Sequence, residues 1–299
     1  MPTYVDGPVR VSVPATSANL GPGFDAFGLA LSLRDELEAE VVPEGLIVEV
    51  EGAGADDVPR DETHLVVRSM RAAFELMGEQ PPGLRLSCHN VIPHARGLGS
   101  SSAAIVSGVV LARALVAGGQ LLASDDALLD LAADLEGHPD NVAAAFHGGF
   151  VVSGREDGRW FAVRVGVDPR VTAVAFVPPT GVETTVARGL LPATVPHADA
   201  AANSGRAALL VAALTGQPEH LLIATRDWLH QDQREPAMPE SLALVRRLRA
   251  DGVPAVVSGA GPTVLAFGSS DTSLLTARCP DGWECHDLVI EPNGATLLT

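Results

Sequence analysis

The sequence predicts an α+β fold, because strand-like and helix-like segments follow one another without regular βαβ alternation. Strand patterns dominate the first third of the 299 residues, joined by turns rich in Gly, Pro and Asp. Helical periodicity then takes over, and the pattern restarts with a strand at Val171–Val177. The restart predicts two domains, spanning residues 1–165 and 166–299.

In the first predicted domain, β-branched or alternating runs indicate strands, and apolar residues at spacings of three and four indicate helices. The predicted strands are Val9–Val13, Asp35–Val42, Leu46–Val50 and Leu84–Cys88, with a hairpin of Phe150–Ser153 and Phe161–Val165. The predicted helices are Leu65–Met77, a segment from the serines at 100–102 to near Ala117, Ala127–Leu135 and a short helix after Asp140.

The same two periodicities divide the second predicted domain. After the strand Val171–Val177, the predicted helices lie near Val186–Leu191, Ala200–Leu214, His220–Leu229 and Ser241–Ala250. The later predicted strands are Ala255–Ser258, Val264–Phe267 and Leu288–Glu291.

All 20 basic residues are arginine, and the sequence contains no lysine. A P-loop ending in Gly-Lys-Ser/Thr, a Schiff-base lysine and a lysine general base are therefore excluded. A bound nucleotide would have its charge met by backbone N–H groups, hydroxyls, arginine and a divalent metal. Coding bias is the simpler origin of the arginine usage, and the exclusion holds in either case.

A formal net charge of −17 argues against nucleic-acid binding, which depends on a basic surface that neutralises phosphates. The three cysteines, Cys88, Cys279 and Cys285, lack a metal-binding spacing, so we expect buried reduced thiols. No apolar run approaches the ~20 residues that span a bilayer, and Met1–Gly7 lacks the pattern of a signal peptide. We therefore expect a cytoplasmic protein that binds no membrane.

Residues 93–103, Pro-His-Ala-Arg-Gly-Leu-Gly-Ser-Ser-Ser-Ala, place a glycine-serine loop at the start of a predicted helix. Backbone N–H groups at a helix N-terminus and the positive end of the helix dipole favour an anion. Gly97 and Gly99 permit positive φ and leave room for a close phosphate, while the serines can donate to phosphate oxygens or ligate a cation. An ordinary capped loop is the alternative interpretation.

Two more glycine-rich segments lie far from this loop in the sequence. Residues 14–25 read Pro-Ala-Thr-Ser-Ala-Asn-Leu-Gly-Pro-Gly-Phe-Asp, and residues 257–263 read Val-Ser-Gly-Ala-Gly-Pro-Thr. We call these the first and third motifs, and residues 93–103 the second. Together the three resemble the signatures of the GHMP kinase superfamily. The third motif is expected to form a turn that steadies the second, or else a plain connection between strands.

Within this superfamily the chain is most similar to the homoserine kinase family. The first motif and residues 136–141, Glu-Gly-His-Pro-Asp-Asn, resemble that family's substrate-side motifs, and Thr184–Arg188 and His230–Arg234 also fit. The resemblance implies an N-terminal domain like ribosomal protein S5 domain 2, a ferredoxin-like C-terminal domain and an active site between them. It implies transfer of the ATP γ-phosphoryl group to L-homoserine, giving O-phospho-L-homoserine and ADP in threonine biosynthesis.

The resemblance also assigns a nucleotide site. His64, which stands where the family commonly has Asn, is the candidate adenine contact. Ser101 and Glu136 would hold Mg²⁺, for which hydroxyl and carboxylate oxygens are suitable ligands. From residue type alone, Glu136 is more simply a solvated carboxylate at a helix end. The ATP phosphates would be held by Pro93, Arg96, Gly97, Leu98, Gly99, Ser100, Ser101, Ser102 and Ala103.

Homoserine carries an ammonium, a carboxylate and a reacting hydroxyl, and the resemblance distributes these among polar residues. Asn19 and Asp25 would bind the ammonium end. Arg188 and Arg234 would bind the carboxylate, with which guanidinium forms bidentate pairs. A helix cap and surface arginines are the simpler interpretation of these residues one by one. The remaining contacts would be His138, Asn141 and Thr184.

The sequence offers no evident general base, because it lacks lysine and because Asn141, which resembles the family residue near the substrate hydroxyl, cannot accept a proton. We predict catalysis by positioning and charge stabilisation through Glu136, Asn141 and Ser101, with the proton passing late to phosphate or solvent. A carboxylate base at Asp25 or Asp140 is the alternative.

Two other functions stay open at this stage. The chain could phosphorylate another small alcohol such as mevalonate, although a mevalonate site has no ammonium for Asn19 and Asp25 to bind. It could also be a catalytically inactive nucleotide-binding relative, although the serines and Glu136 are present. A homodimer is common in the family, and no residue pattern indicates one here.

Overall fold

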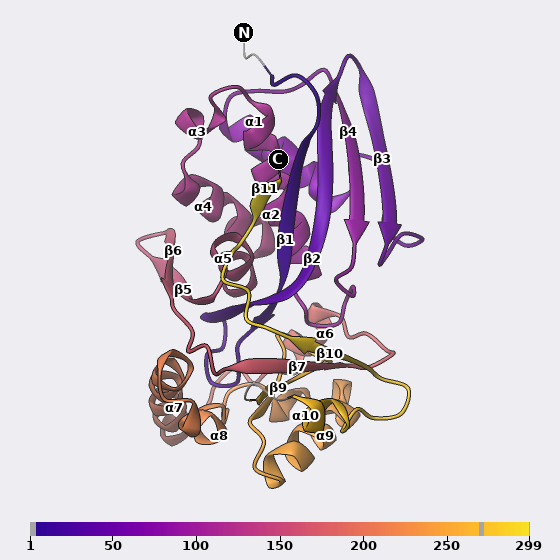
Figure 1. Ribbon diagram of the computed structural model, residues 1–299. Helices are drawn as coiled ribbons and strands as arrows, with labels where there is room; N and C mark the ends of the chain where they lie inside the picture. The colour runs from indigo at the N-terminus through magenta and orange to yellow at the C-terminus, as the bar shows by residue number, and fades with distance from the viewer. Residues whose placement is uncertain (1–3, 269–271, 299) are drawn as a thin grey trace.

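The computed structural model describes residues 4–268 and 272–298, which form two β-sheets with helices packed against each (Figure 1). The larger sheet has the strand order β11-β1-β2-β4-β3, and β5 continues it by pairing with β2 and β6. The smaller sheet has the order β10-β7-β9-β8. The predicted α+β class is confirmed. Residues 1–3 of the segment considered for a signal peptide lie outside the described residues.

The strands of the larger sheet are β1 (Val9–Ala18), β2 (Phe27–Val42), β3 (Gly45–Gly52), β4 (Gly83–Asn90), β5 (Phe150–Glu156), β6 (Arg159–Val165) and β11 (Thr296–Leu298). Those of the smaller sheet are β7 (Thr172–Val177), β8 (Ala255–Val257), β9 (Val264–Gly268) and β10 (Glu284–Leu288). The helices that accompany the larger sheet are α1 (Leu65–Leu76), α2 (Ser100–Leu115), α3 (Gly119–Leu122), α4 (Asp125–Glu136) and α5 (Asp140–His147). The later helices are α6 (Thr184–Gly189), α7 (His197–Thr215), α8 (Leu221–Ala224), α9 (Pro239–Ala250) and α10 (Ser273–Thr276), with 3₁₀ turns η1 (Pro218–His220) and η2 (Asp232–Ala237).

Helix α2 is the central helix of the larger layer. It packs against β1 and is flanked by α1, α4 and α5, so apolar residues are buried around its whole circumference. Gly108 allows α1 to approach closely, because a Cβ at this position would lie 2.6 Å from the carbonyl oxygen of Val66. This packing fixes the helix axis and therefore the position of its N-terminus at Ser100.

The end of the chain returns from the smaller sheet to the larger one (Figure 1). After β10, Ile290 forms a bridge with Leu31, and the Glu291 N–H donates to Ala30 O at 3.0 Å. Ala295 N–H donates to Ala145 O in α5 at 2.8 Å, and β11 then pairs antiparallel with β1. We call residues 289–295 the C-terminal strap, and it connects both sheets to α5.

Two predicted elements are wrong. The helix predicted at His220–Leu229 ends at Ala224, because the carboxylate of Asp227 accepts hydrogen bonds from the N–H groups of Leu229, His230 and Gln231 and so replaces helical bonds. The strand predicted at Leu288–Glu291 is instead β10, which ends at Leu288 where the C-terminal strap leaves the smaller sheet.

The predicted strand Asp35–Val42 is the second half of a longer strand. Strand β2 begins at Phe27, and its first five residues are buried on both faces. A strand covered on both sides has no alternation of apolar and polar residues, so the pattern did not identify this half.

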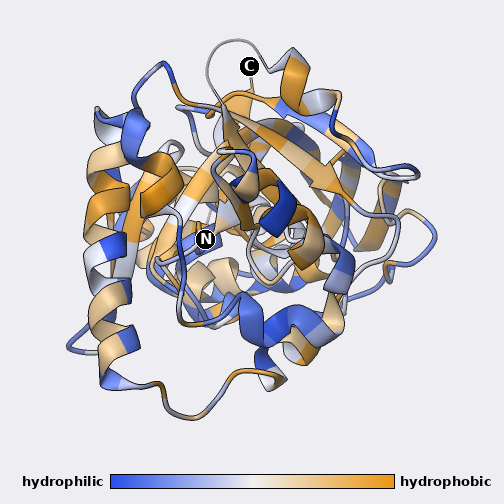
Figure 2. Cartoon of the chain, turned by 90° about the horizontal axis from the view of Figure 1, so that it is seen from below, coloured by the Kyte–Doolittle hydropathy of each residue, from blue (hydrophilic) through white to orange (hydrophobic). Residues whose placement is uncertain are grey.

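Seen from below, the strands are mainly hydrophobic, the outer helices carry both hydrophobic and hydrophilic residues, and many loops at the rim are hydrophilic (Figure 2). In the described part of the chain, no helix combines the length and the apolar character needed to cross a membrane.

Exchanging Gly108 for alanine tests the close approach of α1 to α2. We expect Gly108→Ala to lower the free energy of unfolding by about 1–3 kcal/mol, since the added methyl meets backbone atoms that cannot move aside. Gly205→Ala in the exposed interior of α7, where a Cβ would meet no atom within 4 Å, should instead raise it by about 0.5–1 kcal/mol. Urea denaturation measures both, and equal effects would contradict the packing.

Candidate active site

Two adjoining cavities share Ser100 and Ser101 of the second motif: one lies between this motif and residues of the C-terminal half, and the other lies beside β2, β4 and α1 of the larger layer. The first, which we call the polar cavity, encloses about 260 Å³. The second, the apolar cavity, encloses about 270 Å³. Sequence-predicted residues that line the polar cavity are Asn19, Gly97, Gly99, Ser100, Ser101, Glu136, His138, Asn141, Thr184, Arg188 and Arg234. The structure therefore brings most of the predicted site together from both halves of the chain.

The second motif is held by close backbone contacts. Gly97 has φ +75°, and a Cβ there would clash with the carbonyl oxygen of Ser258. The hydroxyl of Ser258 donates to Gly97 O at 2.6 Å and lies 2.8 Å from the hydroxyl of Ser17. The third motif thus forms a turn against the second motif. Helix α2 begins behind Gly99 without a side-chain cap, which leaves its first N–H groups free of a capping side chain.

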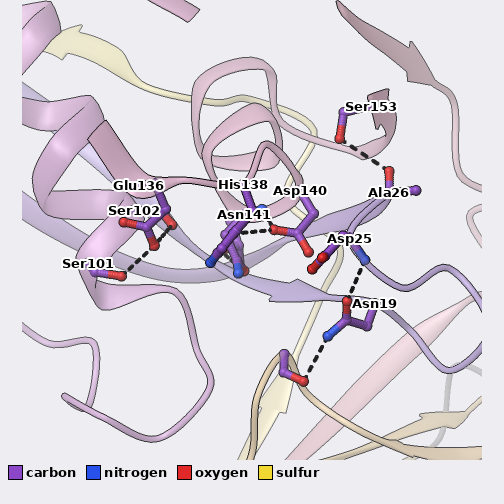
Figure 3. Close-up of polar contacts among 12 residues, drawn as sticks. Asn19, Asp25, Ala26, Ser101, Ser102, Glu136, His138, Asp140, Asn141 and Ser153 are labelled. Atoms are coloured by element: carbon purple, nitrogen blue, oxygen red, sulfur yellow. Dashed lines mark hydrogen bonds and ion pairs between the residues drawn. The ribbon is translucent and has the colours of Figure 1, made fainter. Parts of the chain in front are cut away.

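Glu136, the last residue of α4, directs its carboxylate at the serines of the second motif (Figure 3). Its Oε1 accepts from the Ser101 hydroxyl at 2.7 Å and from the Ser102 hydroxyl at 2.9 Å. The described residues contain no group of three or more His, Cys, Asp and Glu side chains placed to hold a metal. A hard cation bound here would therefore take further oxygens from a ligand or from water.

The start of α5 carries three linked polar residues (Figure 3). Asp140 is buried, and its Oδ1 accepts from the Asn141 N–H at 2.8 Å and lies 2.9 Å from Nδ1 of His138. Burial lowers the pKa of His138, but the hydrogen bond and charge of Asp140, assisted by Glu136, outweigh it and raise the pKa overall. The hydroxyl of Thr16 donates to Oδ1 of Asn141 at 2.8 Å, which fixes the amide beside Gly99.

Asp25 and Arg188 form an ion pair with each other. Two nitrogens of the guanidinium lie 2.6 and 3.0 Å from the two carboxylate oxygens, and each side chain is about one third exposed. Asn19, at φ +67°, accepts from the Asp25 N–H at 2.9 Å and donates to Gly259 O at 2.9 Å (Figure 3). Asn19 therefore joins the first motif to the third.

Arg234 is 1% exposed although it lines the polar cavity. Its Nη1 donates to Gly259 O at 3.1 Å, and its Nε is buried without a hydrogen-bond partner. Burial and the nearby charge of Arg188 lower its pKa to about 10, so the guanidinium stays charged at neutral pH. A buried cation of this kind is complementary to an anionic ligand group.

His64 does not line the polar cavity. It lines the apolar cavity, which also includes Ser100 and Ser101. It precedes α1, its Nδ1 is buried without a partner, and burial lowers its pKa. Neighbouring Thr63 and the apolar side chains of Val58 and Leu65 also line this cavity. The cavity thus offers an apolar slot with a few polar atoms beside the serine loop.

Five predicted nucleotide residues line neither cavity. The guanidinium of Arg96 donates to Pro178 O at 3.1 Å and to Pro179 O at 2.6 Å, so it holds the loop to the segment after β7. The other four also belong to the second motif. They are Pro93 and the buried Leu98, Ser102 and Ala103.

Thr16, His230 and Gly259 also support the site, and the sequence interpretation did not assign them a role. Thr16 and Gly259 belong to the first and third motifs, so the motifs themselves contained the signal. His230 belongs to a segment noted only for Arg234. A buried histidine has no pattern of its own that marks it in a sequence.

Residues 64–149 match the family model of the GHMP kinases N-terminal domain, and residues 208–278 match that of the GHMP kinases C-terminal domain. Over 298 residues the chain is 56% identical to a homoserine kinase from Streptomyces coelicolor, a match that covers 99% of this chain and 96% of the relative. The chain belongs to the homoserine kinase family of the GHMP kinases.

Other homoserine kinases are similar to this chain in sequence or in fold. That from Streptomyces avermitilis is 56% identical over 99% of this chain and 98% of its own. The crystal structure of the homoserine kinase from Cytophaga hutchinsonii has the same fold, with a TM-score of 0.83 at 24% identity over 99% of this chain and 100% of that chain. The predicted family, its fold and the assignment to the ATP-dependent kinases are therefore confirmed.

Removing the charge of Asp140 tests the origin of the His138 pKa. In the wild-type protein, NMR titration should show a pKa of His138 above the ordinary histidine value of about 6.5. In Asp140→Asn it should titrate below that value, because burial remains while the ion pair is lost. His147, whose pKa burial lowers, serves as the control and should not change.

The same shift predicts a pH dependence of stability. Because the folded-state pKa of His138 is raised, its protonation stabilises the folded protein below about pH 6.5, and this contribution is lost as the pH rises through the folded pKa. Thermal denaturation should show the loss in the wild type and not in Asp140→Asn.

Proposed function

We propose that this chain transfers the γ-phosphoryl group of ATP to the hydroxyl of L-homoserine, giving O-phospho-L-homoserine and ADP as a step of threonine biosynthesis. One observation carries the proposal: a serine-lined helix N-terminus and a set of amino-acid-binding charges meet at one cavity. The helix end suits phosphates. Asp25 with Arg188 and Arg234 matches the ammonium and carboxylate of an amino acid.

In this proposal residues 1–165 form the nucleotide-binding domain and residues 166–299 the second domain, with the active site between them. The adenine occupies the apolar cavity beside His64, and the phosphates lie along Gly97–Ser102. The shared lining at Ser100 and Ser101 supports this arrangement, since the two cavities adjoin at the point where a base would give way to phosphates.

Magnesium fits the oxygen cluster at Glu136. The carboxylate and the Ser101 hydroxyl are hard oxygen ligands 2.7 Å apart, a donor set that suits this ion together with phosphate oxygens and water. When bound, Mg²⁺ would neutralise charge on the phosphates, a task for which this chain has no lysine. Ser102, buried behind the loop, keeps Glu136 aimed at this position.

Homoserine binding would exchange the partners of the Asp25–Arg188 ion pair. The ammonium of the amino acid replaces Arg188 at the Asp25 carboxylate, and its carboxylate replaces Asp25 at Arg188 and reaches Arg234. Each side chain thus trades one charged partner for another, so neither charge is left unpaired. Arg188 lines the polar cavity and Asp25 does not, but both side chains are partly exposed, which leaves the pair accessible to a ligand.

The chemistry then rests on positioning and charge stabilisation. Thr16 binds the amide oxygen of Asn141, so the amide NH₂ is the group available to hydrogen-bond an oxygen of the substrate or the transferring phosphoryl group. An amide does not accept the hydroxyl proton, so this proton leaves late, to phosphate or solvent. His138, held by Asp140, also lines the cavity, and its raised pKa favours the cationic form of the ring.

The Asp25–Arg188 pair also separates homoserine from mevalonate. Mevalonate has a carboxylate and no ammonium, so turning Arg188 towards it would leave Asp25 without a cationic partner. A catalytically inactive relative would have no use for the carboxylate and two hydroxyls that converge at Glu136.

A substrate panel tests this proposal directly. With ATP and Mg²⁺, we expect coupled ADP release with L-homoserine, and only background release with mevalonate or without an acceptor. Turnover with mevalonate alone would refute the assignment. No turnover with any acceptor would favour the inactive nucleotide-binding relative.

Two substitutions in α4 separate the metal role of Glu136 from the general effect of removing a negative charge from this helix. Glu136→Gln should lower kcat by at least about tenfold and shift the Mg²⁺ titration to higher concentrations, because an amide oxygen is a weaker ligand for a hard cation. Asp134→Asn in the same helix is the matched control, since this carboxylate faces the Trp160 indole instead. An unchanged Mg²⁺ titration in Glu136→Gln would remove the residue from the metal site.

A further inference from the structure

The segment from Asp227 to Arg234 forms a rigid turn behind the polar cavity. Asp227 fixes its first half, because its Oδ2 accepts from the N–H groups of His230 at 3.0 Å and Gln231 at 2.7 Å. The Gln231 side chain then accepts from the Val257 N–H at 2.6 Å, at the start of the third motif. The side chain of His230 is left in a fully buried position between the first motif and Arg234.

Both ring nitrogens of His230 have a partner whose role is fixed by its chemistry. Nε2 lies 2.7 Å from the carbonyl oxygen of Gly21, which only accepts hydrogen bonds. Nδ1 lies 3.0 Å from Nη1 of Arg234, which only donates. These two contacts require a neutral imidazole with its proton on Nε2. Burial lowers the pKa of His230, which favours the same neutral form.

The contact with His230 determines how the Arg234 guanidinium is turned. Nη1 is held between His230 Nδ1 and Gly259 O, at 3.0 and 3.1 Å. The guanidinium is planar, so fixing this nitrogen fixes the direction of the other two. The ring of Phe24 limits the remaining movement, since it lies 5.5 Å from the Arg234 guanidinium and 5.2 Å from the His230 ring.

We propose that His230 is a positioning residue for substrate binding: its neutral, Nε2-protonated ring accepts from Arg234 and turns the guanidinium towards the substrate carboxylate, while its Nε2–H ties this arrangement to the first motif at Gly21. The inference rests on the proposed function, in which Arg234 binds the carboxylate of homoserine. It assigns a role to a residue that never touches the substrate.

A purely structural role is the competing explanation, in which His230 matters only because it holds the first motif. Two substitutions separate the two contacts of the ring. In His230→Asn, the amide oxygen can take the place of Nδ1 and accept from Arg234, while the contact with Gly21 is lost. In His230→Gln, the amide nitrogen can take the place of Nε2 and donate to Gly21, while the acceptor for Arg234 is lost.

The expected result is a split between the two variants and between the two substrates. His230→Gln should raise the KM for homoserine by at least about tenfold, because hydrogen bonds to charged groups are among the stronger ones, and the KM for ATP should change by less than about twofold. His230→Asn should keep the KM for homoserine well below that of His230→Gln. His197→Gln, on the exposed start of α7, is the matched control and should behave as the wild type.

A double substitution tests whether His230 acts through Arg234. Arg234→Gln alone should raise the KM for homoserine, and adding His230→Gln should raise it by less than a further twofold or so, since the residue to be positioned is gone. If His230→Gln leaves the KM for homoserine unchanged, or raises both KM values equally, the inference is overturned while the proposed function stands. A wild-type enzyme without homoserine turnover would instead overturn the proposed function.

The tautomer can be checked without any substitution. In protein labelled with ¹⁵N-histidine, His230 should show a protonated Nε2 and an unprotonated Nδ1 at neutral pH, and adding homoserine should shift the Nδ1 resonance. A charged ring, or a proton on Nδ1, would contradict the contact with Arg234. This measurement can overturn the inference even where a variant fails to fold.

Discussion

The site depends on the close approach of two backbone segments, Gly97 in the second motif and Ser258 in the third. No side chain fits between them, and the Ser258 hydroxyl closes the contact through Gly97 O. The first motif joins the same junction, because Ser17 lies 2.8 Å from Ser258 and Asn19 binds Gly259 O. Segments more than 150 residues apart in the sequence are thereby fixed within hydrogen-bond distance of one another. The packing of α2 fixes the serine end of this helix, and the junction holds the residues that the first and third motifs contribute to the polar cavity beside it.

The chain has no lysine, and it uses three arginines near this junction in different ways. Arginine can be anchored through some of its nitrogens while others remain available, because its donors lie in a planar fork. Arg96 uses the fork entirely for backbone carbonyls and stabilises the loop. Arg188 is paired with a carboxylate and can exchange partners, whereas Arg234 is anchored at one end by Gly259 and His230. The three arginines therefore have different roles. Of the three, Arg234 is the one that is anchored at one end and still lines the polar cavity with its charge in a fixed direction.

The sequence predicted what local pattern and motif chemistry determine. Helices with clear apolar spacing, such as α1 and α4, were predicted to within a few residues, and the three motifs supply half of the residues that line the polar cavity. The return of the C-terminal strap to the larger sheet was not predictable, because the short segments after β10 pair with strands that lie more than 250 residues earlier in the sequence. Nor could the partners within the site be predicted: the sequence indicated that Asp25 and Arg188 bind a substrate, but only the structure places them against each other.

The C-terminal strap explains why an exchange of ion-pair partners suits this site better than a large movement between the sheets. Arg34 donates to the carbonyls of Asn293 and Gly294, and a Cβ at Gly294 would clash with the backbone of α5 at Phe146. Helix α5 is therefore held at its C-terminal end by the strap and at its N-terminal end by the Thr16–Asn141 bond. A displacement of the smaller sheet would pull on the strap, which follows β10 directly, and would break the contacts of the third motif with Gly97 and Asn19. In the proposed function, the Asp25–Arg188 pair, in which each side chain is about one third exposed, would accommodate the charges of a zwitterion by exchanging partners, so that neither side chain loses a charged partner.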